Sequence, residues 1–195
     1  MKKLVFALAT ALAALAAQAQ EWKLDASHSS VNFTITHMMV SEVHGNFRNF
    51  SAVATATKPD FSDLATTFTI DANTINTADE KRDEHLRSDD FFATSKYPNI
   101  TFKSSSIKKI DDKKFVLEGE MTMHGVTKKI SWDLKYNGTV NDGRGGKKAG
   151  FKATTTINRK DYGISFGRVL DNGGAMLSDE VEIVVSVELN QSGTK

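Results

Sequence analysis

The sequence of 195 residues contains no cysteine. This absence excludes disulfide bonds, thiolate metal ligands and a cysteine nucleophile. A small secreted domain often depends on disulfides, because its hydrophobic core is small. A chain of this length buries most of its unfolded surface and can fold without them. Packing and hydrogen bonds must therefore hold the fold together.

Neither sign of charge dominates, with 25 basic and 24 acidic residues. This balance gives no support for a nucleic-acid partner. The one long apolar run, residues 4–15, follows Lys2 and Lys3 and precedes the small residues of Ala17-Gln18-Ala19. It is shorter than the about 20 residues that a membrane-spanning helix needs. The pattern predicts a signal peptide at residues 1–19, one domain over 20–195, and a mature protein in the periplasm or outside the cell without stable membrane insertion.

Motifs of catalysis are also missing. The sequence has no Gly-x-Ser-x-Gly elbow and no phosphate-binding glycine loop. Its acidic residues mostly lie on the polar faces of the expected strands, where a paired-carboxylate site is not expected. The histidines lack the spacing of a zinc motif; they are His28, His37, His44, His85 and His124. These absences favour binding over catalysis, and predict neither a metal nor a cofactor.

Apolar and polar residues alternate along most of the chain, which is typical of half-buried β-strands. Turn residues separate the runs, and His124-Gly125 between two of them predicts a tight hairpin. A less regular run at 46–57 predicts a strand with a bulge near Phe50. The expected strands cover residues 31–37, 46–57, 67–71, 99–103, 114–123, 126–136, 151–157 and 181–189.

Eight amphipathic strands without intervening helices indicate an all-β fold, either a sandwich or a closed barrel. We favour an extended eight-stranded antiparallel barrel, because closure removes exposed strand edges. Eight strands also make the smallest barrel that can hold one small ligand inside.

A charged segment near residues 78–90 interrupts the strands and is expected to be helical. Thr77 and Glu80 have capping-box spacing, which predicts a helix beginning near Ala78. Asp83 and Arg87 stand four residues apart and predict an ion pair on the helix surface. The segment is either a connector pinned by apolar residues or a lid that meets the polar end of a ligand.

Several segments together resemble the YceI-like family. They cover nearly the whole chain after the expected leader, in the same order as in the family. The matching segments are Asp25-Ala26-Ser27-His28-Ser29-Ser30-Val31-Asn32-Phe33, His37, Gly45-Asn46-Phe47, Arg82-Asp83-Glu84-His85-Leu86-Arg87-Ser88, Tyr97-Pro98-Asn99-Ile100-Thr101-Phe102, Met123-His124-Gly125-Val126-Thr127-Lys128, Ile157-Asn158-Arg159-Lys160-Asp161-Tyr162-Gly163 and Asp179-Glu180-Val181-Glu182-Ile183.

The resemblance implies a periplasmic protein with a lipocalin-like barrel that holds a long isoprenoid or related lipid, such as a quinone or a polyprenyl species, in an internal tunnel. The inward phase of the strands then predicts the tunnel lining: Phe33, Ile35, Phe68, Phe102, Leu117, Met121, Ile130, Trp132, Phe151, Ile183 and Val185. The hypothesis for the headgroup or lid is His37, Arg82, His85 and Arg159, with Asp83 positioning one of the basic groups.

Two alternatives to a lipid carrier stay open. One is an enzyme that acts on an enclosed apolar substrate with His37 or His85 as its base. The other is a stress-related barrel whose filled interior binds nothing, since a solid core needs the same inward apolar residues as a tunnel. A homodimer also stays open as the state of assembly.

Overall fold

The computed structural model describes residues 19–171 and 173–191. The expected signal peptide, apart from Ala19, lies outside the described residues. In the described ranges no helix combines the length and apolar character needed to cross a membrane. The elements are β1 (Gln20–His37), β2 (Ser41–Phe47), β3 (Phe50–Ala56), β4 (Ala65–Asp71), η1 (Ala72–Thr74), β5 (Ile75–Asn76), α1 (Glu80–Arg87), β6 (Asn99–Lys109), β7 (Lys114–Met123), β8 (Val126–Asn141), β9 (Lys147–Asn158), η2 (Arg159–Tyr162) and β10 (Leu177–Gln191).

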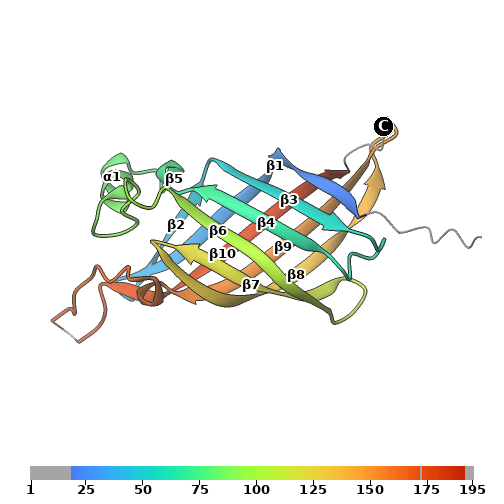
Figure 1. The fold of residues 1–195 in the computed structure, drawn as a ribbon. Helices are drawn as coiled ribbons and strands as arrows, with labels where there is room; N and C mark the ends of the chain where they lie inside the picture. The colour runs from blue at the N-terminus through green and yellow to red at the C-terminus, as the bar shows by residue number, and fades with distance from the viewer. Residues whose placement is uncertain (1–18, 172, 192–195) are drawn as a thin grey trace, which may run out of the picture.

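The strands form a closed eight-stranded antiparallel barrel, as the sequence predicts (Figure 1). Neighbouring strands follow the order β10-β9-β8-β7-β6-β4-β3-β1, and β1 pairs with β10 to close the ring. The short strands β2 and β5 continue the positions of β3 and β4, since β2 pairs with the second half of β1 and β5 pairs with β2.

The strand expected at 46–57 is two strands, β2 and β3, separated at Arg48 and Asn49. Pairing also begins earlier than expected, at Ser41. The backbone N–H of Arg48 donates to the Thr74 carbonyl at 3.2 Å, and that of Asn49 to the Thr74 hydroxyl at 3.0 Å. These bonds replace the strand-to-strand hydrogen bonds at Arg48 and Asn49. The irregular alternation of the sequence at 46–57 therefore corresponds to the break between β2 and β3, just before Phe50.

The hairpin between β7 and β8 is confirmed. His124 and Gly125 have φ angles of 51° and 75°. Positive φ at both central residues is typical of the two-residue turns that match strand twist. Tyr97 closes over this turn, with a ring carbon 2.6 Å from where a Cβ on Gly125 would lie.

The start of α1 differs from the expected capping box. Asp79 is the N-cap, and its carboxylate accepts a hydrogen bond from the Arg82 N–H at 3.0 Å. Thr77 lies before the helix, and both its N–H and its hydroxyl donate to Asp83. Asp83 is therefore buried, and the expected surface pair with Arg87 does not form. A tertiary contact has replaced the local motif.

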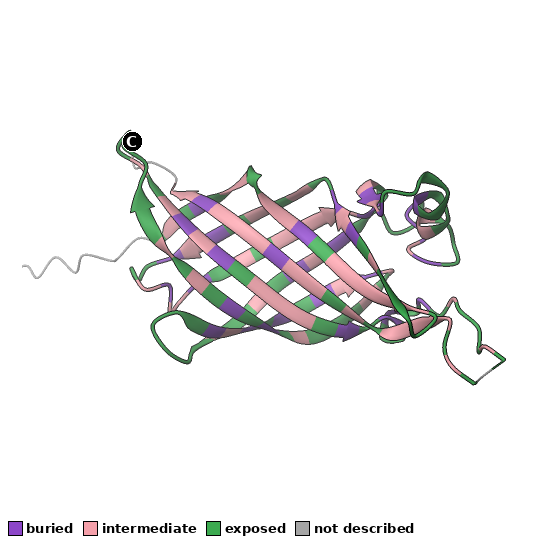
Figure 2. Cartoon of the chain, turned by 180° about the vertical axis from the view of Figure 1, so that it is seen from behind, coloured by how far each residue is buried: buried purple, intermediate pink, exposed green. Residues whose placement is uncertain are grey.

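Burial alternates along the strands, while α1 and its neighbouring segments are mostly exposed (Figure 2). Two inward glycines leave room for aromatic rings in this core. A Cβ on Gly45 would lie 2.2 Å from the Phe33 ring, and one on Gly119 would lie 2.5 Å from the Phe102 ring. Glycine at these positions permits close approach of ring and backbone.

Candidate ligand-binding cavity and its mouth

The barrel encloses a cavity of about 190 Å³ with an almost wholly apolar lining. It exceeds the roughly 150 Å³ of an apolar cavity that binds benzene. All the residues expected to line a tunnel contribute to it, except Ile130. They are Phe33, Ile35, Phe68, Phe102, Leu117, Met121, Trp132, Phe151, Ile183 and Val185.

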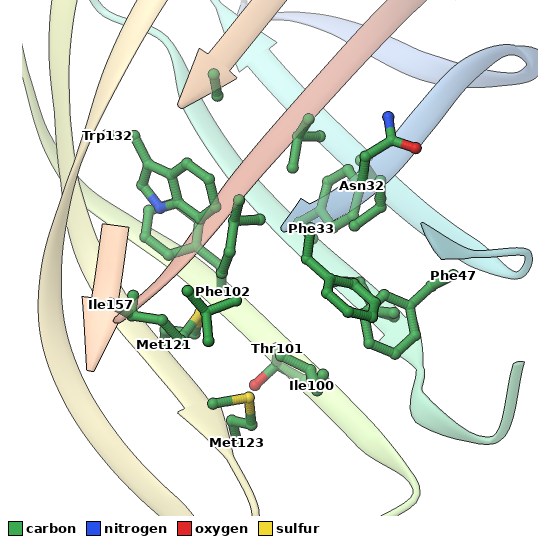
Figure 3. Close-up of a pocket in the computed structure, with 18 of the residues that line it drawn as sticks. Asn32, Phe33, Phe47, Ile100, Thr101, Phe102, Met121, Met123, Trp132 and Ile157 are labelled. Carbon is green, nitrogen blue, oxygen red and sulfur yellow. The ribbon is translucent and has the colours of Figure 1, made fainter. Parts of the chain in front are cut away.

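Aromatic side chains face this cavity from different parts of the barrel (Figure 3). Phe33 of β1 and Phe47 of β2 lie on one side, with ring centroids 5.8 Å apart. Phe102 of β6 and Trp132 of β8 lie on the other, 5.9 Å apart with their rings edge to face. Aromatic pairs at such distances attract one another, and here they line two sides of the cavity.

Ile130 packs against the core but does not line the cavity. Its partner across the β7–β8 ladder is Gly119, whose inward space the Phe102 ring takes up. Other lining residues share the inward strand phase and could have been found from it: Val31, Met123, Leu134, Ile157, Val181, Val187 and Leu189. Ile164 lies in irregular backbone, where no periodic signal exists.

A second cavity of about 250 Å³ lies against the first, at the α1 end of the barrel. Phe33, Ile35, Leu86 and Phe91 line both cavities. The second cavity is therefore the mouth of the first. Its further lining consists of His37, Val43, Arg82, His85, Phe166, Met176 and Leu177.

The opposite end of the barrel is closed by aromatic packing. Phe61, from the segment between β3 and β4, is 2% exposed. Its ring centroid lies 5.2 Å from that of Trp22, 5.3 Å from Tyr136 and 5.1 Å from Phe151. The cavity thus has one sealed end and one lined mouth.

Arg82 is held at the mouth by Thr77. Its Nε donates to the Thr77 hydroxyl oxygen at 2.7 Å, and its Nη2 donates to the Thr77 carbonyl at 2.8 Å. The Thr77 hydroxyl donates in turn to Asp83 at 2.5 Å. Asp83 thus contacts Arg82 through Thr77 and does not line the mouth itself, and its role in positioning a basic group stays a prediction.

The two histidines of the mouth differ in their contacts. His85 Nε2 lies 2.9 Å from Asp90 Oδ2, and the His85 ring packs edge-on against Phe91 and Phe166. His37 ends β1 at the rim, and no partner for its ring nitrogens is found in the described part of the chain. The ring of His37 is thus available to a ligand.

Arg159 reaches the inner cavity but already has partners for most of its donors. Its Nε donates to the Ser178 carbonyl at 2.9 Å, and its Nη1 to the carbonyls of Ile164 and Phe166 at 2.9 and 2.7 Å. Burial lowers its pKa, which Asp179 opposes. Arg159 therefore anchors the segment after η2, and its side chain is poorly suited to a headgroup.

One group of polar residues lies away from the cavity, where β1 bulges out between Asp25 and Ser30. Asp25, His28 and Glu188 come together there with metal-ligand atoms within 4.8 Å. Lys148 Nζ lies 2.5 Å from Glu188 and 3.3 Å from Asp25. The lysine ammonium pairs with both carboxylates, so the group forms an ion-pair network.

The fold is a closed antiparallel barrel with an apolar interior, and a barrel of eight strands is wide enough to hold one small ligand. The model of the YceI-like domain family matches residues 22–189, and the chain belongs to this family. A UPF0312 protein of Staphylococcus aureus (strain N315) is 40% identical over 169 residues, which cover 86% of this chain and 96% of the relative.

Solved structures show the same fold. A YceI protein of Campylobacter jejuni has a TM-score of 0.71 at 32% identity, covering 81% of this chain and 90% of its own. BcnA of Burkholderia cenocepacia has a TM-score of 0.72 at 22% identity, covering 85% and 98%. A polyisoprenoid binding domain of Saccharophagus degradans, implicated in plant cell wall breakdown, has a TM-score of 0.64 at 16% identity, covering 88% and 98%.

Proposed function

We propose that this protein binds the apolar chain of an isoprenoid-type lipid inside the barrel and acts as a periplasmic carrier or sequestering protein. The observation that supports the proposal best is the apolar cavity that continues into a mouth through Phe33, Ile35, Leu86 and Phe91. A filled barrel would lack such a space. The name of the Saccharophagus degradans domain, which shares the fold, points to the same class of ligand.

The size of the cavity suggests how a long chain would be accommodated. The inner space suits a few isoprene units, while a longer tail also needs the mouth or movement of the lining. Met121 and Met123 are suited to such movement, because methionine is flexible and polarisable. Each buried CH₂ contributes about 0.8 kcal/mol, so affinity rises with chain length until the space is filled.

The decisive experiment is to purify the mature protein from its native compartment, extract it with organic solvent and analyse the extract by mass spectrometry. A prenyl lipid in stoichiometric amount supports the proposal. Repeatedly empty extracts from folded protein contradict it and favour the barrel without a ligand. Recovery of the protein from the cytoplasm would contradict the periplasmic location.

A variant experiment tests the cavity itself. Phe102→Asp places a carboxylate in the lining and should abolish retention of geranylgeraniol, because the charge would need water in an apolar space. Lys103→Asp alters the exposed neighbour on the same strand and should retain it. Equal retention by the two variants would remove Phe102 from the binding site, provided that both variants keep the far-ultraviolet spectrum of the barrel.

The enzyme alternative draws on one observation, the contact between His85 and Asp90. A carboxylate can orient a histidine that acts as a base. The side chains are 44% and 58% exposed, however, so the pair is open to water and typical of a surface contact. Turnover of a prenyl ester that is lost in His85→Gln would favour the enzyme.

A further inference from the structure

Two loops at the mouth end of the barrel present large apolar side chains to solvent. The turn between β1 and β2 carries Met38, Met39 and Val40, which are 43%, 63% and 86% exposed. The segment between η2 and β10 carries Val169, which is 73% exposed. Figure 1 shows the chain before β10 projecting beyond the end of the barrel, apart from α1. We name these four side chains the rim patch.

Backbone hydrogen bonds join the two loops. The Met38 N–H donates to the Met176 carbonyl at 2.8 Å, and the Met176 N–H donates to the Arg168 carbonyl at 3.0 Å. Val169 directly follows Arg168 in the chain. Met176 also lines the mouth of the cavity, as does His37, which directly precedes the turn. The rim patch is therefore one surface, and it borders the opening of the barrel.

The turn holds its two methionines in an unfavourable backbone conformation. Met38 and Met39 have φ angles of 51° and 63°, and the Val40 N–H donates to the His37 carbonyl at 3.2 Å. Two-residue hairpin turns of this geometry favour Asn-Gly, because a long side chain at positive φ is strained. Burial does not offset the strain, since both side chains are exposed. The sequence thus places apolar groups at a tip where the stability of the fold alone would favour other residues.

The size and charge of the rim patch indicate what kind of partner covers it. A stable protein interface buries about 800 Å² on each partner. An aromatic side chain buries about 150–250 Å², and four partly exposed Met and Val side chains offer less than that interface needs. Arg168 and Asp171 balance each other on the second loop, so no charged partner is indicated. A fluid bilayer requires neither a matching surface nor opposite charge, since apolar groups gain free energy by entering its hydrocarbon boundary.

We propose that the rim patch docks reversibly onto the surface of a phospholipid bilayer and so sets the open mouth against the membrane. This inference rests on the proposed function, since the bilayer is then the source or the destination of the carried chain. An apolar chain that leaves a docked mouth enters hydrocarbon without exposing its CH₂ groups to water. Four side chains are far fewer than the about 20 residues of a membrane-spanning helix, so the contact stays at the surface.

The first test uses the absence of native cysteine, which allows a single introduced cysteine to carry a fluorescent label. Met39→Cys labelled with nitrobenzoxadiazole should shift its emission to the blue when vesicles of phosphatidylethanolamine and phosphatidylglycerol are added. Ile110→Cys is the matched control, because Ile110 is a 55% exposed apolar residue in the turn between β6 and β7, at the sealed end. Its label should not shift. No shift at Met39, or equal shifts at the two positions, would overturn docking through the rim patch.

The second test measures how much of the mature protein sediments with the same vesicles. Val40→Asp should lower the partition coefficient about tenfold, because the tip loses apolar area and gains a charge. Val140→Asp makes the same change at a 63% exposed residue of β8 near the sealed end, and should leave the partition coefficient unchanged. Val40 lines neither cavity, so both variants should bind geranylgeraniol as the unmodified protein does.

The outcomes separate this inference from the proposed function. Full vesicle binding by Val40→Asp, together with normal binding of geranylgeraniol, would overturn the docking surface and leave the lipid carrier standing. Vesicle binding that disappears on adding salt would assign the contact to charge and would also overturn it. Failure of the delipidated protein to bind geranylgeraniol would overturn the proposed function, while the label at Met39 would still report whether the rim patch meets a bilayer.

Discussion

The two ends of the barrel are built in different ways. At the sealed end a short segment places Phe61 among Trp22, Tyr136 and Phe151, and aromatic contacts fill the space. At the mouth end α1 and the residues after η2 surround a cavity with histidine and arginine side chains. Figure 1 shows α1 at the end of the barrel away from the segment between β3 and β4.

The two ends should therefore differ in how much they contribute to the stability of the fold. The sealed end buries aromatic area and excludes water, so it should contribute more to the free energy of unfolding. The mouth end holds polar groups in fixed positions through contacts such as that of Arg82 with Thr77. Substitutions at the two ends should therefore have different readouts.

The largest effect is expected from truncating the aromatic plug. Phe61→Ala should lower the free energy of unfolding by about 3–5 kcal/mol, because it leaves a cavity among packed rings. Phe166→Ala, the matched change at the half-buried mouth residue, should lower it by about half as much or less. Urea unfolding measures both. Equal losses would contradict the division between the two ends.

The next effect concerns the contact that holds Arg82. Thr77→Val removes the hydroxyl but keeps the shape, leaving the buried Asp83 with fewer partners. It should lower the free energy of unfolding by about 1–3 kcal/mol. Thr77→Ser keeps the hydroxyl and should have a much smaller effect in the same urea titration. Similar losses in both variants would show that packing of the methyl group is what matters.

The pH dependence should also differ between the ends. At the mouth end, burial raises the pKa of Tyr162 to about 12. Its hydroxyl has no hydrogen-bond partner in the described part of the chain. The unfolded chain releases this proton near pH 10, before the folded chain does. Stability should therefore fall as the pH rises from about 10 to 12.

The control for this alkaline loss is Tyr162→Phe, which should flatten it in thermal melts and leave stability at pH 7 similar or higher. An unchanged alkaline loss of stability would assign that loss to other groups.

At the sealed end, hydrogen bonds from Ser27 and His28 hold the pKa of Asp25 well below its ordinary value. That contribution is present above about pH 4 and is lost as the pH falls through the lower pKa of the folded state.

The smallest effect tests how α1 begins. Asp79→Ala removes the observed cap and should lower the free energy of unfolding by about 1 kcal/mol. Glu80→Ala should change it much less, because Glu80 does not complete a capping box in the structure. The reverse order in urea unfolding would restore the capping box expected from the spacing of Thr77 and Glu80.

The strands and the inner cavity could be predicted well, because a period of two specifies which residues face inward. Phase alone predicts that Phe102 and Trp132 face inward, and both line the cavity. Ile130 has the same phase, but lies outside the lining because the Phe102 ring, from β6 two strands away, takes up the space beside it. Whether an inward residue reaches the cavity depends on how side chains from different strands pack together.

The mouth was harder to predict. His37 is expected there because it ends an inward apolar face, and Arg82 and His85 because they belong to the charged helical segment; the structure brings the three together. Arg159 is also expected at the headgroup, yet its side chain donates to backbone carbonyls. Phe166 lies in irregular backbone and gave no signal. A residue's chemistry shows what it can bind, but only its neighbours decide whether its donors are free.

The sequence by itself determined the all-β class and the apolar inward faces, because alternation and turn residues act locally, and its ordered motifs determined the family. Only the tertiary structure decided that the interior is hollow, that Phe61 seals one end, and that Asp83 holds Arg82 through Thr77 at the other. Whether inward side chains fill a barrel depends on how strands distant in sequence pack together. A pattern along one strand carries no such information.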